Sequence, residues 1–527
     1  MNDSPVMQAA TQRWPGALHL APSAPGQPEV LECRAECLAE VCAWLFDERD
    51  HGFAGLVVEE TASEWVLRYL FYGVRPQGWV QVLLRAPLAS QRFPSISLRV
   101  HAADWHEREA EDLFGLVFEG HPHLGDFILH NDCWQESLEP MRKRFDAGRA
   151  VTQREPQPDW QPPRLLEQTG AFGMPVGPVF SGAAESVHFL LETIGEDVTR
   201  VYPRLFYKYR AIEKIAEGRR VEDVVLLAER CNGLSAFAHA LACCQAAEFA
   251  LGAEVPQRAR ALRAFAAELE RLRHHVGAIH EICESTALAV ATSQAAILEE
   301  ELLRLSAVLS GHRYLFGLCV PGGLSRDLEN GACRAALDAA QTCLRRLRKL
   351  ERALRFSNSF LDRLEEVGFV PPERARSHSL VGPVARASGL RRDLRRVQPY
   401  LDYGALRFEV PCEQEGDGYA RLRVLFAEAA QSVELMAQLA ASLPSGPVRA
   451  PLPAGRGGAA LGWAEAPIGA TFHWLRIGAG GTVERYRLIT PSFINWHAFH
   501  LAAEDFAFQD FPIILASYGL SVTENDR

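Results

Sequence analysis

Residues 258–284, RARALRAFAAELERLRHHVGAIHEICE, decide the architecture of most of the chain. Apolar side chains recur in this stretch at alternating spacings of three and four residues, as one stripe of an α-helix requires. The stripe consists of Leu262, Phe265, Leu269, Leu272, Val276 and Ile279. Pro256 stands shortly before it, where proline suits the start of a helix. The spacing therefore predicts a long helix with one buried face.

Two segments on the C-terminal side repeat the helical pattern. Residues 338–357 carry leucines at the helical spacing, and residues 427–443 read as a third long helix. Basic side chains fill the rest of the first segment: Arg345, Arg346, Arg348, Lys349, Arg352 and Arg355. They favour a solvated helix face, with an anion or partner site as the alternative. Glycine clusters and short alternating runs in residues 451–487 predict a small β element within this helical region.

The N-terminal side has a different pattern. Residues 154–163, REPQPDWQPP, contain four prolines, which disfavour regular ladders and favour an extended linker. Before this linker, residues 28–47 read as a helix, and the aromatic and β-branched runs 64–72 (EWVLRYLFY) and 79–84 (WVQVLL) read as strands.

The expected fold class is therefore α+β. Residues 1–150 form a small α/β domain, residues 151–172 a proline-rich linker, and residues 173–527 a mainly helical domain with a small β element. A chain of 527 residues is long enough for such cores.

Composition excludes several classes of protein. Hydrophobic residues make up 48% and charged residues 23%, which is ordinary globular usage. The 55 basic and 66 acidic side chains give a net charge of −11, so no overall field attracts nucleic acid. The longest apolar runs, such as residues 511–520, are shorter than the roughly 18 residues of a spanning helix, and the first residues lack the apolar core of a secretory signal. We expect a cytoplasmic protein, soluble or peripheral on a membrane, with mostly buried free cysteines.

Residues 105–124, WHEREAEDLFGLVFEGHPHL, gather acids, bases and aromatic residues. Such a cluster is either a metal or proton-transfer site or an ion-paired loop at an interface. The string resembles the signature of the 30 kDa subunit of respiratory complex I, and Trp134 and residues 141–145 (MRKRF) continue the match. The resemblance covers residues 30–147. Gly125 and Asp126 stand where that family carries arginines.

The rest of the chain, residues 175–527, resembles the 49 kDa subunit of complex I and its relatives, the large subunits of membrane-bound nickel-iron hydrogenases of the formate hydrogenlyase type. The matching strings are residues 205–214 (LFYKYRAIEK), 254–263 (EVPQRARALR), 268–275 (ELERLRHH), 321–327 (PGGLSRD), 382–400 (GPVARASGLRRDLRRVQPY), 416–421 (GDGYAR) and 510–512 (DFP).

The resemblance to hydrogenases implies four thiolate ligands for nickel, supplied by two C-x-x-C pairs. The aligned positions hold Asn232, Ser235, Ser521 and Glu524, and Cys231 is one place off. No C-x-x-C string occurs in the sequence. We therefore expect no nickel-iron centre and no other metal site in this chain.

The resemblance to complex I implies two quinone ligands, a histidine in a Q-H-P string and a tyrosine on the first long helix. Phe180 stands at the histidine position and Gly233 at the tyrosine position. His188 and Tyr202 lie nearby in the sequence. They are either substitute ligands or ordinary structural residues.

Three residues remain from the polar cavity that the resemblance implies. Arg210 and Glu213 occupy the R-x-x-E positions, where the glutamate of hydrogenase relatives gates protons. Glu213 and Lys214 either carry protons or pair structurally. His239, seven residues after Asn232, either relays a proton or caps the position of the lost metal. A further set at three-and-four spacing predicts a structural network: Glu268, Arg271 and His275.

Together these features predict the large subunit of a membrane-attached, complex I-like or hydrogenase-like oxidoreductase. The resemblance implies a small iron-sulfur subunit and proton-translocating membrane subunits as partners, on the inner face of the cell membrane. In one hypothesis, electrons from the partner's cluster reduce a quinone or another acceptor, with Glu213, Arg210 and His239 as site residues. In the other, the chain is a catalytically inactive scaffold and conformational coupler. The electron donor, NADH included, stays open.

Overall fold

The computed structural model describes residues 4–74, 78–130, 133–134, 138–146, 148, 169–180 and 185–527. Contacts within the chain divide it into two compact units. Unit 1 contains residues 1–164 and two short returning segments, 205–209 and 377–379, and unit 2 contains the rest. Of the expected linker, residues 151–168 lie outside the described residues.

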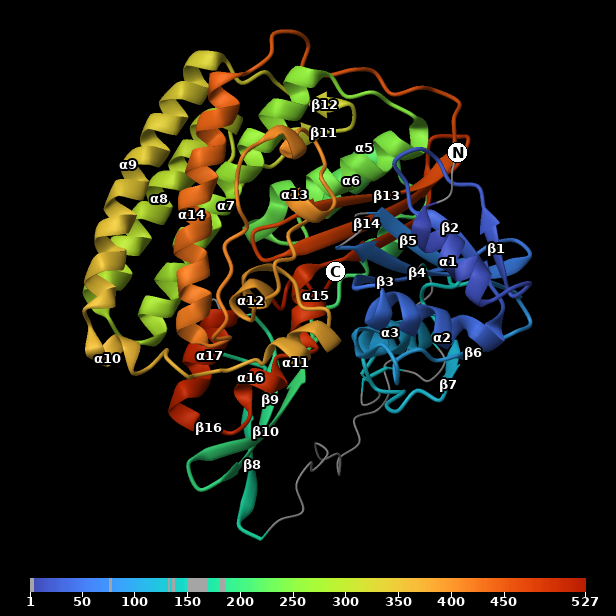
Figure 1. Ribbon diagram of the computed structural model, residues 1–527, viewed down its shortest axis with the longest axis horizontal. Coiled ribbons are helices and arrows are strands. Elements are labelled where there is room, and N and C mark those ends of the chain that lie inside the picture. Colours follow the sequence, from blue (N-terminus) through green and yellow to red (C-terminus); the bar gives the residue numbers. More distant parts are fainter. Residues whose placement is uncertain are drawn as a thin grey trace. The chain divides into compact units, whose positions relative to one another are not determined.

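Unit 1 is built on a five-stranded sheet with the order β1-β2-β5-β4-β3 (Figure 1). Its strands are β1 (Leu18–Ala21), β2 (Glu29–Cys33), β3 (His51–Glu60), β4 (Glu64–Gly73) and β5 (Gly78–Pro87). The long strands β3, β4 and β5 pair antiparallel, and β2 pairs parallel with β5. Aromatic and β-branched side chains suit this sheet because both of its faces are covered, and neighbouring residues Tyr69 and Leu70 of β4 are both fully buried.

The prediction of a single helix over residues 28–47 was wrong in its first part. Its first part is β2, and helix follows only in η1 (Ala35–Cys37), α2 (Leu38–Ala43) and a π-helical turn (Trp44–Glu48). The ladder of β2 with β5 joins residues 51 positions apart, such as Glu32 and Leu83, so tertiary pairing overrides local propensity. The remaining elements of unit 1 are α1 (Pro5–Arg13), β6 (Arg92–Pro94), η3 (His101–Ala103), α3 (Asp104–Phe114) and β7 (Val117–Glu119).

The charged cluster at residues 105–124 holds the fold of unit 1 together. Glu107 of α3 is fully buried and accepts hydrogen bonds from Ile96 N at 2.9 Å and Ser95 Oγ at 2.5 Å. Burial raises the pKa of its carboxyl to about 8. Glu111 accepts a hydrogen bond from Gly125 N at 2.7 Å. These acids therefore anchor loop backbone, and no metal-binding group of three or more His, Cys, Asp or Glu occurs among the described residues.

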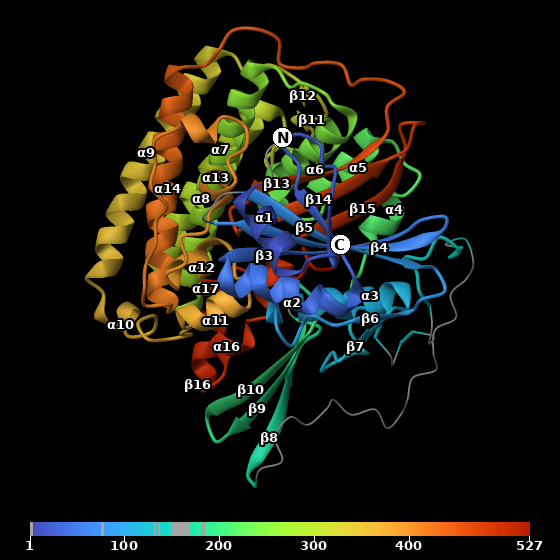
Figure 2. The same cartoon turned by 45° about the vertical axis from the view of Figure 1, so that its right-hand side comes forward.

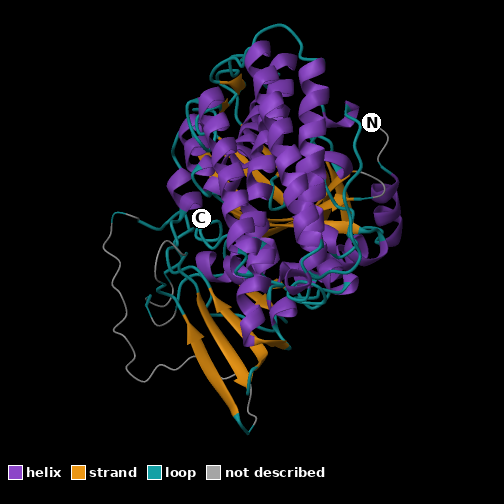
Figure 3. Ribbon diagram, turned by 90° about the vertical axis from the view of Figure 1, so that its left-hand side faces the viewer, coloured by secondary structure: helices purple, strands orange, loops and turns teal. Residues whose placement is uncertain are grey.

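Unit 2 contains a bundle of four long helices, α7 (Gln257–Ser285), α8 (Ala289–Ser310), α9 (Asn330–Arg355) and α14 (Gly418–Ala441), which Figure 3 shows side by side. The predicted apolar stripe of α7, from Leu262 to Ile279, is fully buried. The third predicted helix begins earlier than expected because the carboxylate of Asp417 caps it, accepting from Ala420 N at 2.7 Å. Amphipathic stripes thus place the bundle core as the sequence predicts.

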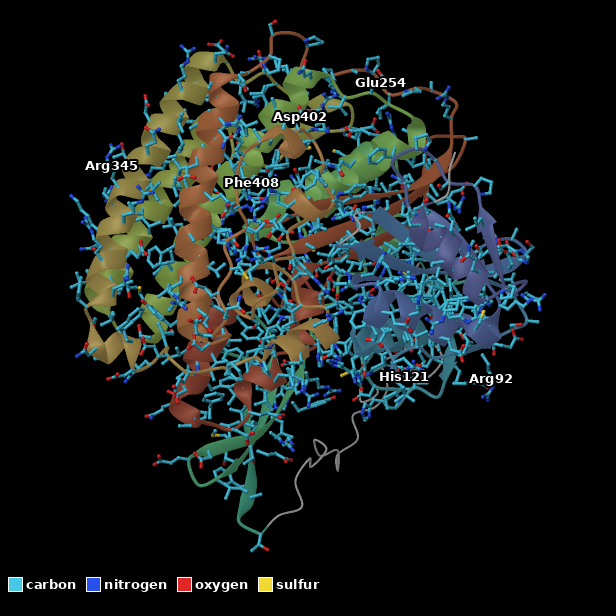
Figure 4. The ribbon with its side chains drawn as sticks, in the orientation of Figure 1. Arg92, His121, Glu254, Arg345, Asp402 and Phe408 are labelled. Atoms are coloured by element: carbon cyan, nitrogen blue, oxygen red, sulfur yellow. The ribbon has the colours of Figure 1, made fainter. Side chains whose placement is uncertain are left out.

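The basic residues of the 338–357 segment lie on the outer surface of α9, where Figure 4 shows Arg345 pointing away from the bundle. Arg346 pairs with Glu301 of α8 at 2.6 Å, and both side chains are about half exposed. Exposed pairs of this kind contribute about 0–1 kcal/mol, so the face is solvated rather than structural.

A buried charged network fills the centre of unit 2 and includes all three residues of the predicted network. Glu268 binds Arg395 at 3.0 Å and accepts from Tyr403 Oη at 2.7 Å. Arg271 donates to the backbone carbonyl of Ala466 at 3.2 Å. His275 Nε2 lies 2.9 Å from Glu428 Oε2. Breaking such pairs costs several kcal/mol because a buried charge is left uncompensated.

The predicted β element is an antiparallel sheet of β13 (Gly458–Glu465), β14 (Ala470–Ile477) and β15 (Val483–Ile489), and α6 (Ala236–Leu251) packs against it (Figure 2). A Cβ on Gly462 would lie 2.1 Å from the carbonyl oxygen of Ala242, so glycine permits this close approach. Residues 233–251 are apolar and long enough to cross a membrane, but 83% of that window is buried inside the protein, as in a core helix.

A second sheet in unit 2 has the strand order β16-β10-β9-β8. Strands β8, β9 and β10 precede the helical region in the sequence, whereas β16 follows it. Its strands are β8 (Ala171–Val176), β9 (His188–Ile194), β10 (Asp197–Arg204) and β16 (Phe506–Ala507). The other elements are α4 (Ile212–Ala216), α5 (Val221–Glu229), β11 (Cys319–Val320), β12 (Gly323–Leu324), α10 (Asn358–Leu361), α11 (Pro372–Ser377), α12 (Gly382–Ala387), α13 (Leu394–Val397), α15 (Pro491–Trp496), α16 (His500–Ala503) and α17 (Phe511–Tyr518).

Candidate functional site

Arg210 ties the C-terminal tail, residues 519–527, to the turn that precedes α6. Its guanidinium donates to the carbonyl of Thr523 at 2.6 Å and to that of Cys231 at 2.8 Å. Its backbone N–H donates to the carbonyl of Asp526 at 2.7 Å. The predicted site residue Arg210 therefore fixes the spacing between two segments that carry all four positions aligned with nickel ligands.

Glu213 of α4 is buried, with 2% of its surface exposed, and is held by arginines of β15. Its two carboxylate oxygens accept hydrogen bonds from Arg485 and Arg487, each at 2.9 Å. Leu488 N donates to the same carboxylate at 3.0 Å. Lys214, the expected alternative partner, pairs with Glu217 at 3.1 Å. Glu213 is thus part of a buried ion-pair cluster between α4 and β15.

His239, in the first turn of α6, connects the tail to the β13-β14-β15 sheet. Its Nε2 lies 2.9 Å from Glu524 Oε1, and its Nδ1 lies 3.2 Å from His473 Nε2. His473 Nδ1 in turn lies 2.8 Å from Tyr486 Oη. The second oxygen of Glu524 accepts from Ser492 N at 3.1 Å. A continuous line of hydrogen-bonded side chains therefore runs from β15 to the tail.

Several buried polar atoms around this line have no hydrogen-bond partner among the described residues. They are Asn232 Nδ2, Ser235 Oγ, and both side-chain polar atoms of Asn525. Asn232 is 6% exposed and the other two are fully buried. We call these three residues the polar cradle. An unpaired buried polar atom costs about 1–3 kcal/mol. Asn232 and Ser235 belong to the turn before α6 and Asn525 follows Glu524 in the tail, so each is a candidate to bind a polar ligand.

The atoms at the four aligned positions do not fit nickel. They are an amide, two hydroxyls and a carboxylate, whereas nickel in a redox-active site needs soft thiolates. Ser521 Oγ donates to Glu185 at 2.9 Å, so it is already engaged. The adjacent Cys231 is buried, which raises the pKa of its thiol to about 12 and keeps it protonated.

A pocket of about 700 Å³ borders the tail in unit 2. Its wall is mainly apolar and aromatic, including Phe180, Leu234, Trp496, Phe511 and Leu515. Ser521 and Val522 of the tail complete one side. Four carboxylates line other parts of the wall, Glu185, Glu281, Glu284 and Glu299. Carboxylates in their ionised form repel anionic ligands, and burial raises the pKa of Glu281, which favours its neutral form.

The residues at the aligned quinone positions have different surroundings. Phe180 lines the pocket with its aromatic ring. Gly233 lies at the turn before α6, where a Cβ would meet Tyr314 at 3.7 Å. His188 and Tyr202 are on the paired strands β9 and β10 and are not among the described residues of the pocket wall. Neither is brought to this pocket as a substitute ligand.

Sequence reasoning missed the larger part of the hydrogen-bonded line. Glu524 stands out in the sequence only because the resemblance aligns it with a metal ligand, and its pairing with His239 joins residues 285 positions apart. His473 and Tyr486 lie on neighbouring strands and belong to no motif. The only available signal was that polar residues interrupt the apolar alternation of these buried strands.

Family models match most parts of the chain. Residues 31–151 match the 30 Kd subunit of respiratory-chain NADH dehydrogenase, and residues 291–455 match its 49 Kd subunit. Residues 210–281, which include Arg210, Glu213 and His239, match nickel-dependent hydrogenase.

Whole-chain comparisons agree with these matches. The chain is 32% identical to formate hydrogenlyase subunit 5 of Escherichia coli over 85% of this chain and 79% of that protein. It is 28% identical to hydrogenase-4 component G of Escherichia coli over 99% of this chain and 92% of that protein. It is 25% identical to the C/D subunit of the NADH-quinone oxidoreductase of Methylococcus capsulatus over 99% of this chain and 98% of that protein.

A solved structure shares the fold of the larger part of the chain. It is a chain of the membrane-bound sulfane sulfur reductase, an archaeal respiratory membrane complex, matched with a TM-score of 0.65 at 25% identity over 69% of this chain and 100% of that one. The relatives are thus subunits of membrane-bound respiratory complexes. This chain belongs to the family that unites fused 30 and 49 kDa subunits of complex I with the large subunits of formate hydrogenlyase and hydrogenase-4.

Proposed function

We propose that this chain is the large subunit of a membrane-attached oxidoreductase that passes electrons from an iron-sulfur partner to an acceptor without a nickel-iron centre. The observation that carries the proposal is the polar cradle, whose sequence neighbour Leu234 lines the pocket. Polar groups without partners favour a working site over a collapsed one, because a residual cavity with no function would be filled by apolar side chains.

The absence of nickel is part of the proposal. The ligand positions carry Asn232, Ser235, Ser521 and Glu524, and two of these are engaged in hydrogen bonds with neighbouring side chains. Protonated Cys231 offers no thiolate, and a carboxylate with hydroxyls suits harder ions than nickel. No step of the proposed chemistry therefore passes through a metal bound to this chain.

The pocket wall supports a quinone or a similar uncharged acceptor. Aromatic side chains such as Phe180, Trp496 and Phe511 give flat apolar contacts, and a volume of about 700 Å³ is within the usual range of ligand sites. The carboxylates of the wall disfavour anions such as formate. Several of the similar proteins are named as subunits of NADH-quinone oxidoreductase, which agrees with this choice.

The three predicted site residues take different roles in this proposal. His239 handles protons, because both of its ring nitrogens have side-chain partners capable of exchange. Glu213 and Arg210 shape the site: Glu213 is neutralised by Arg485 and Arg487, and Arg210 holds the tail. The iron-sulfur cluster belongs to a small-subunit partner, and membrane subunits move protons. The complex lies on the cytoplasmic face of the cell membrane.

The scaffold hypothesis keeps one observation in its favour. The residue that gates protons in hydrogenase relatives corresponds to Glu213, and here it is locked in ion pairs with β15. In this hypothesis a chain without the metal ligands and without this proton gate transmits conformational changes between its partner subunits and catalyses no reaction. The pocket and the polar cradle are what this alternative leaves unexplained.

Blocking the pocket distinguishes the two hypotheses. Ala516 lines the pocket, so Ala516→Trp should fill it, whereas Val308→Trp on the 83% exposed surface of α8 is the matched control. The intact complex, purified in detergent, is assayed for reduction of a short-tailed quinone. We expect the wild type and Val308→Trp to reduce the quinone and Ala516→Trp to lose most of this activity. Reduction at wild-type rate by assembled Ala516→Trp would exclude the pocket as the acceptor site.

A further inference from the structure

One face of α7 lines the pocket. The lining residues share this face because they follow the three-and-four spacing of a helix, and they are His274, Gly277, Ala278, Glu281 and Ser285. Burial decreases along the face, since His274 is 5% exposed whereas Glu281 is exposed to solvent. His274 is therefore the buried polar group on this face, and solvent reaches the pocket from the end at Glu281.

A buried hydrogen-bonded chain connects His274 to Glu428 of α14. Glu428 is fully buried and accepts hydrogen bonds from Arg386 and from His275 Nε2, the latter at 2.9 Å. Burial opposes its ionisation, but the Arg386 guanidinium and His275 hold the pKa of its carboxyl well below the ordinary value. Glu428 is therefore a carboxylate, and a carboxylate only accepts hydrogen bonds.

This carboxylate determines the tautomers of two neighbouring imidazoles. Burial lowers the pKa of His275 and lowers that of His274 well below its ordinary value, so each ring carries a single N–H. The N–H of His275 is on Nε2, where it donates to Glu428, and its Nδ1 is left as an acceptor. His274 Nδ1 lies 3.3 Å from that acceptor and donates to it. His274 thus carries its proton on Nδ1 and a lone pair on Nε2.

The lone pair on His274 Nε2 is left for a ligand. Among the described residues, the side chain of His274 forms no hydrogen bond other than the one to His275. Its Nε2 is therefore an acceptor without a protein partner, on a buried residue that lines the pocket. Leaving such an atom unpaired costs free energy, which a donor group of a bound ligand recovers. The ligand must bring the proton, because His274 has none to offer at this nitrogen.

The other donor side chains of the described pocket wall are already engaged. Trp496 Nε1 donates to the carbonyl of Ser521 at 3.2 Å, and Ser521 Oγ donates to Glu185 at 2.9 Å. Ser285 Oγ donates to the carbonyl of Ile282 at 2.9 Å. The remaining polar groups of the described wall are carboxyls, which accept when they are ionised. The wall therefore presents hydrogen-bond acceptors, and it suits a ligand that donates.

The charges around His274 favour a neutral donor over a cation. Besides burial and the imidazole of His275, the guanidiniums of Arg273 and Arg271 lower the pKa of His274, so they also repel a cationic group at Nε2. The carboxylates that would attract a cation include Glu281 and Glu284, which are exposed to solvent, where ion pairs contribute little. A neutral hydroxyl therefore fits this position better than an ammonium group.

We propose that the pocket binds a neutral aromatic ligand whose hydroxyl group donates a hydrogen bond to His274 Nε2, and that this ligand is the hydroquinone form of the acceptor. The inference rests on the proposed function, in which a quinone is reduced at the pocket. A quinone offers carbonyl oxygens, which only accept; two electrons from the iron-sulfur partner and two protons from solvent convert them to hydroxyls. The aromatic wall contacts both forms, but only the reduced form gains the hydrogen bond to His274. Binding therefore makes reduction of the acceptor more favourable.

The test measures how tightly the intact complex binds two redox-inert probes, 1-naphthol and its methyl ether, which has the same rings but no donor. The wild type should bind naphthol more tightly than the ether. This affinity ratio should fall about 10-fold in His274→Phe, which removes the acceptor, and His274→Gln, whose amide oxygen accepts, should retain most of it. His19→Phe on the exposed part of β1 is the matched control and should leave the ratio unchanged. Ala516→Trp, which fills the pocket, should lose binding of both probes.

The outcomes separate this inference from the proposed function. A complex that shows the preference for naphthol but reduces no short-tailed quinone would overturn the proposed function and retain the His274 contact. A complex that reduces the quinone but has the same affinity ratio in the wild type and His274→Phe would overturn the inference. Tighter binding of 1-naphthylmethylammonium than of 1-naphthol would overturn it as well, because the carboxylates would then select the ligand. If His274→Phe fails to assemble, the wild type and His274→Gln decide, and binding of the ether as tightly as naphthol by both would overturn the inference.

Discussion

Glu524 Oε1 lies 2.9 Å from His239 Nε2, and both side chains are completely buried. In the proposed function, Glu524 stands at a position that the resemblance to hydrogenases aligns with a metal-binding thiolate. The pair joins the C-terminal tail to the first turn of α6. It therefore fastens the tail to the helix.

Removal of the imidazole should destabilise the tail. His239→Ala leaves the buried carboxylate without its partner, which costs about 3 kcal/mol. His239→Gln, which retains an N–H at similar reach, should cost less. Thermal unfolding of the full chain measures both, with His188→Ala on β9 as the control. Equal stability of His239→Ala and the wild type would show that the pair contributes nothing to the fold.

Glu213 should behave as a structural residue. Glu213→Gln removes the charge that balances Arg485 and Arg487, so it should weaken assembly or lower stability by about 3 kcal/mol. Glu217→Gln, which breaks the more exposed contact with Lys214, is the control and should be nearly neutral. A Glu213→Gln complex that assembles normally but stops proton-coupled turnover would instead identify a proton gate.

Glu107 should make unit 1 less stable as the pH rises. Burial raises the pKa of its carboxyl to about 8 from an ordinary value of 4.5. Between these values the folded state binds more protons than the unfolded state, so stability falls with rising pH. Glu107→Gln lacks this titration. The Tm of the wild type should therefore fall relative to that of Glu107→Gln from pH 5 to about pH 8, and parallel Tm curves would contradict the assigned burial.

Residues 117–124 should be a contact for another subunit. The segment combines the buried aromatic Phe118 with exposed polar residues such as Glu119 and the half-buried His121, whose position Figure 4 shows. Hydrogen exchange in its amides should slow when the small subunit binds, whereas the amides of buried β4 should not change. The same exchange rate in the isolated chain and the complex would remove this segment from the interface.

The fold could be predicted from sequence where one element determines its own structure. The stripe of α7 and the alternation of β13, β14 and β15 are local patterns, and each produced the expected element. The segment at residues 28–47 failed because β2 is stabilised by pairing with β5, which no local window contains. Asp417 was a readable cap and would have placed the start of α14 correctly.

The site was harder to predict because it is assembled from distant segments. Arg210, Glu213 and His239 were found through resemblance to relatives, but their partners Thr523, Arg485 and His473 lie far along the chain. Spacing on one helix cannot reveal such pairs. The alignment of Glu524 with a thiolate position is an expectation from the sequence, whereas its pairing with His239 required the structure.

The nickel content of the intact complex, measured by elemental analysis while its quinone reduction is followed, tests the central claim most directly. The amide, hydroxyl and carboxylate groups of Asn232, Ser235, Ser521 and Glu524 offer no thiolate for nickel. We expect iron from the partner subunit, no stoichiometric nickel after chelation, no hydrogen evolution, and continued quinone reduction. One retained nickel per chain, with activity that disappears when nickel is withheld during growth, would contradict the claim.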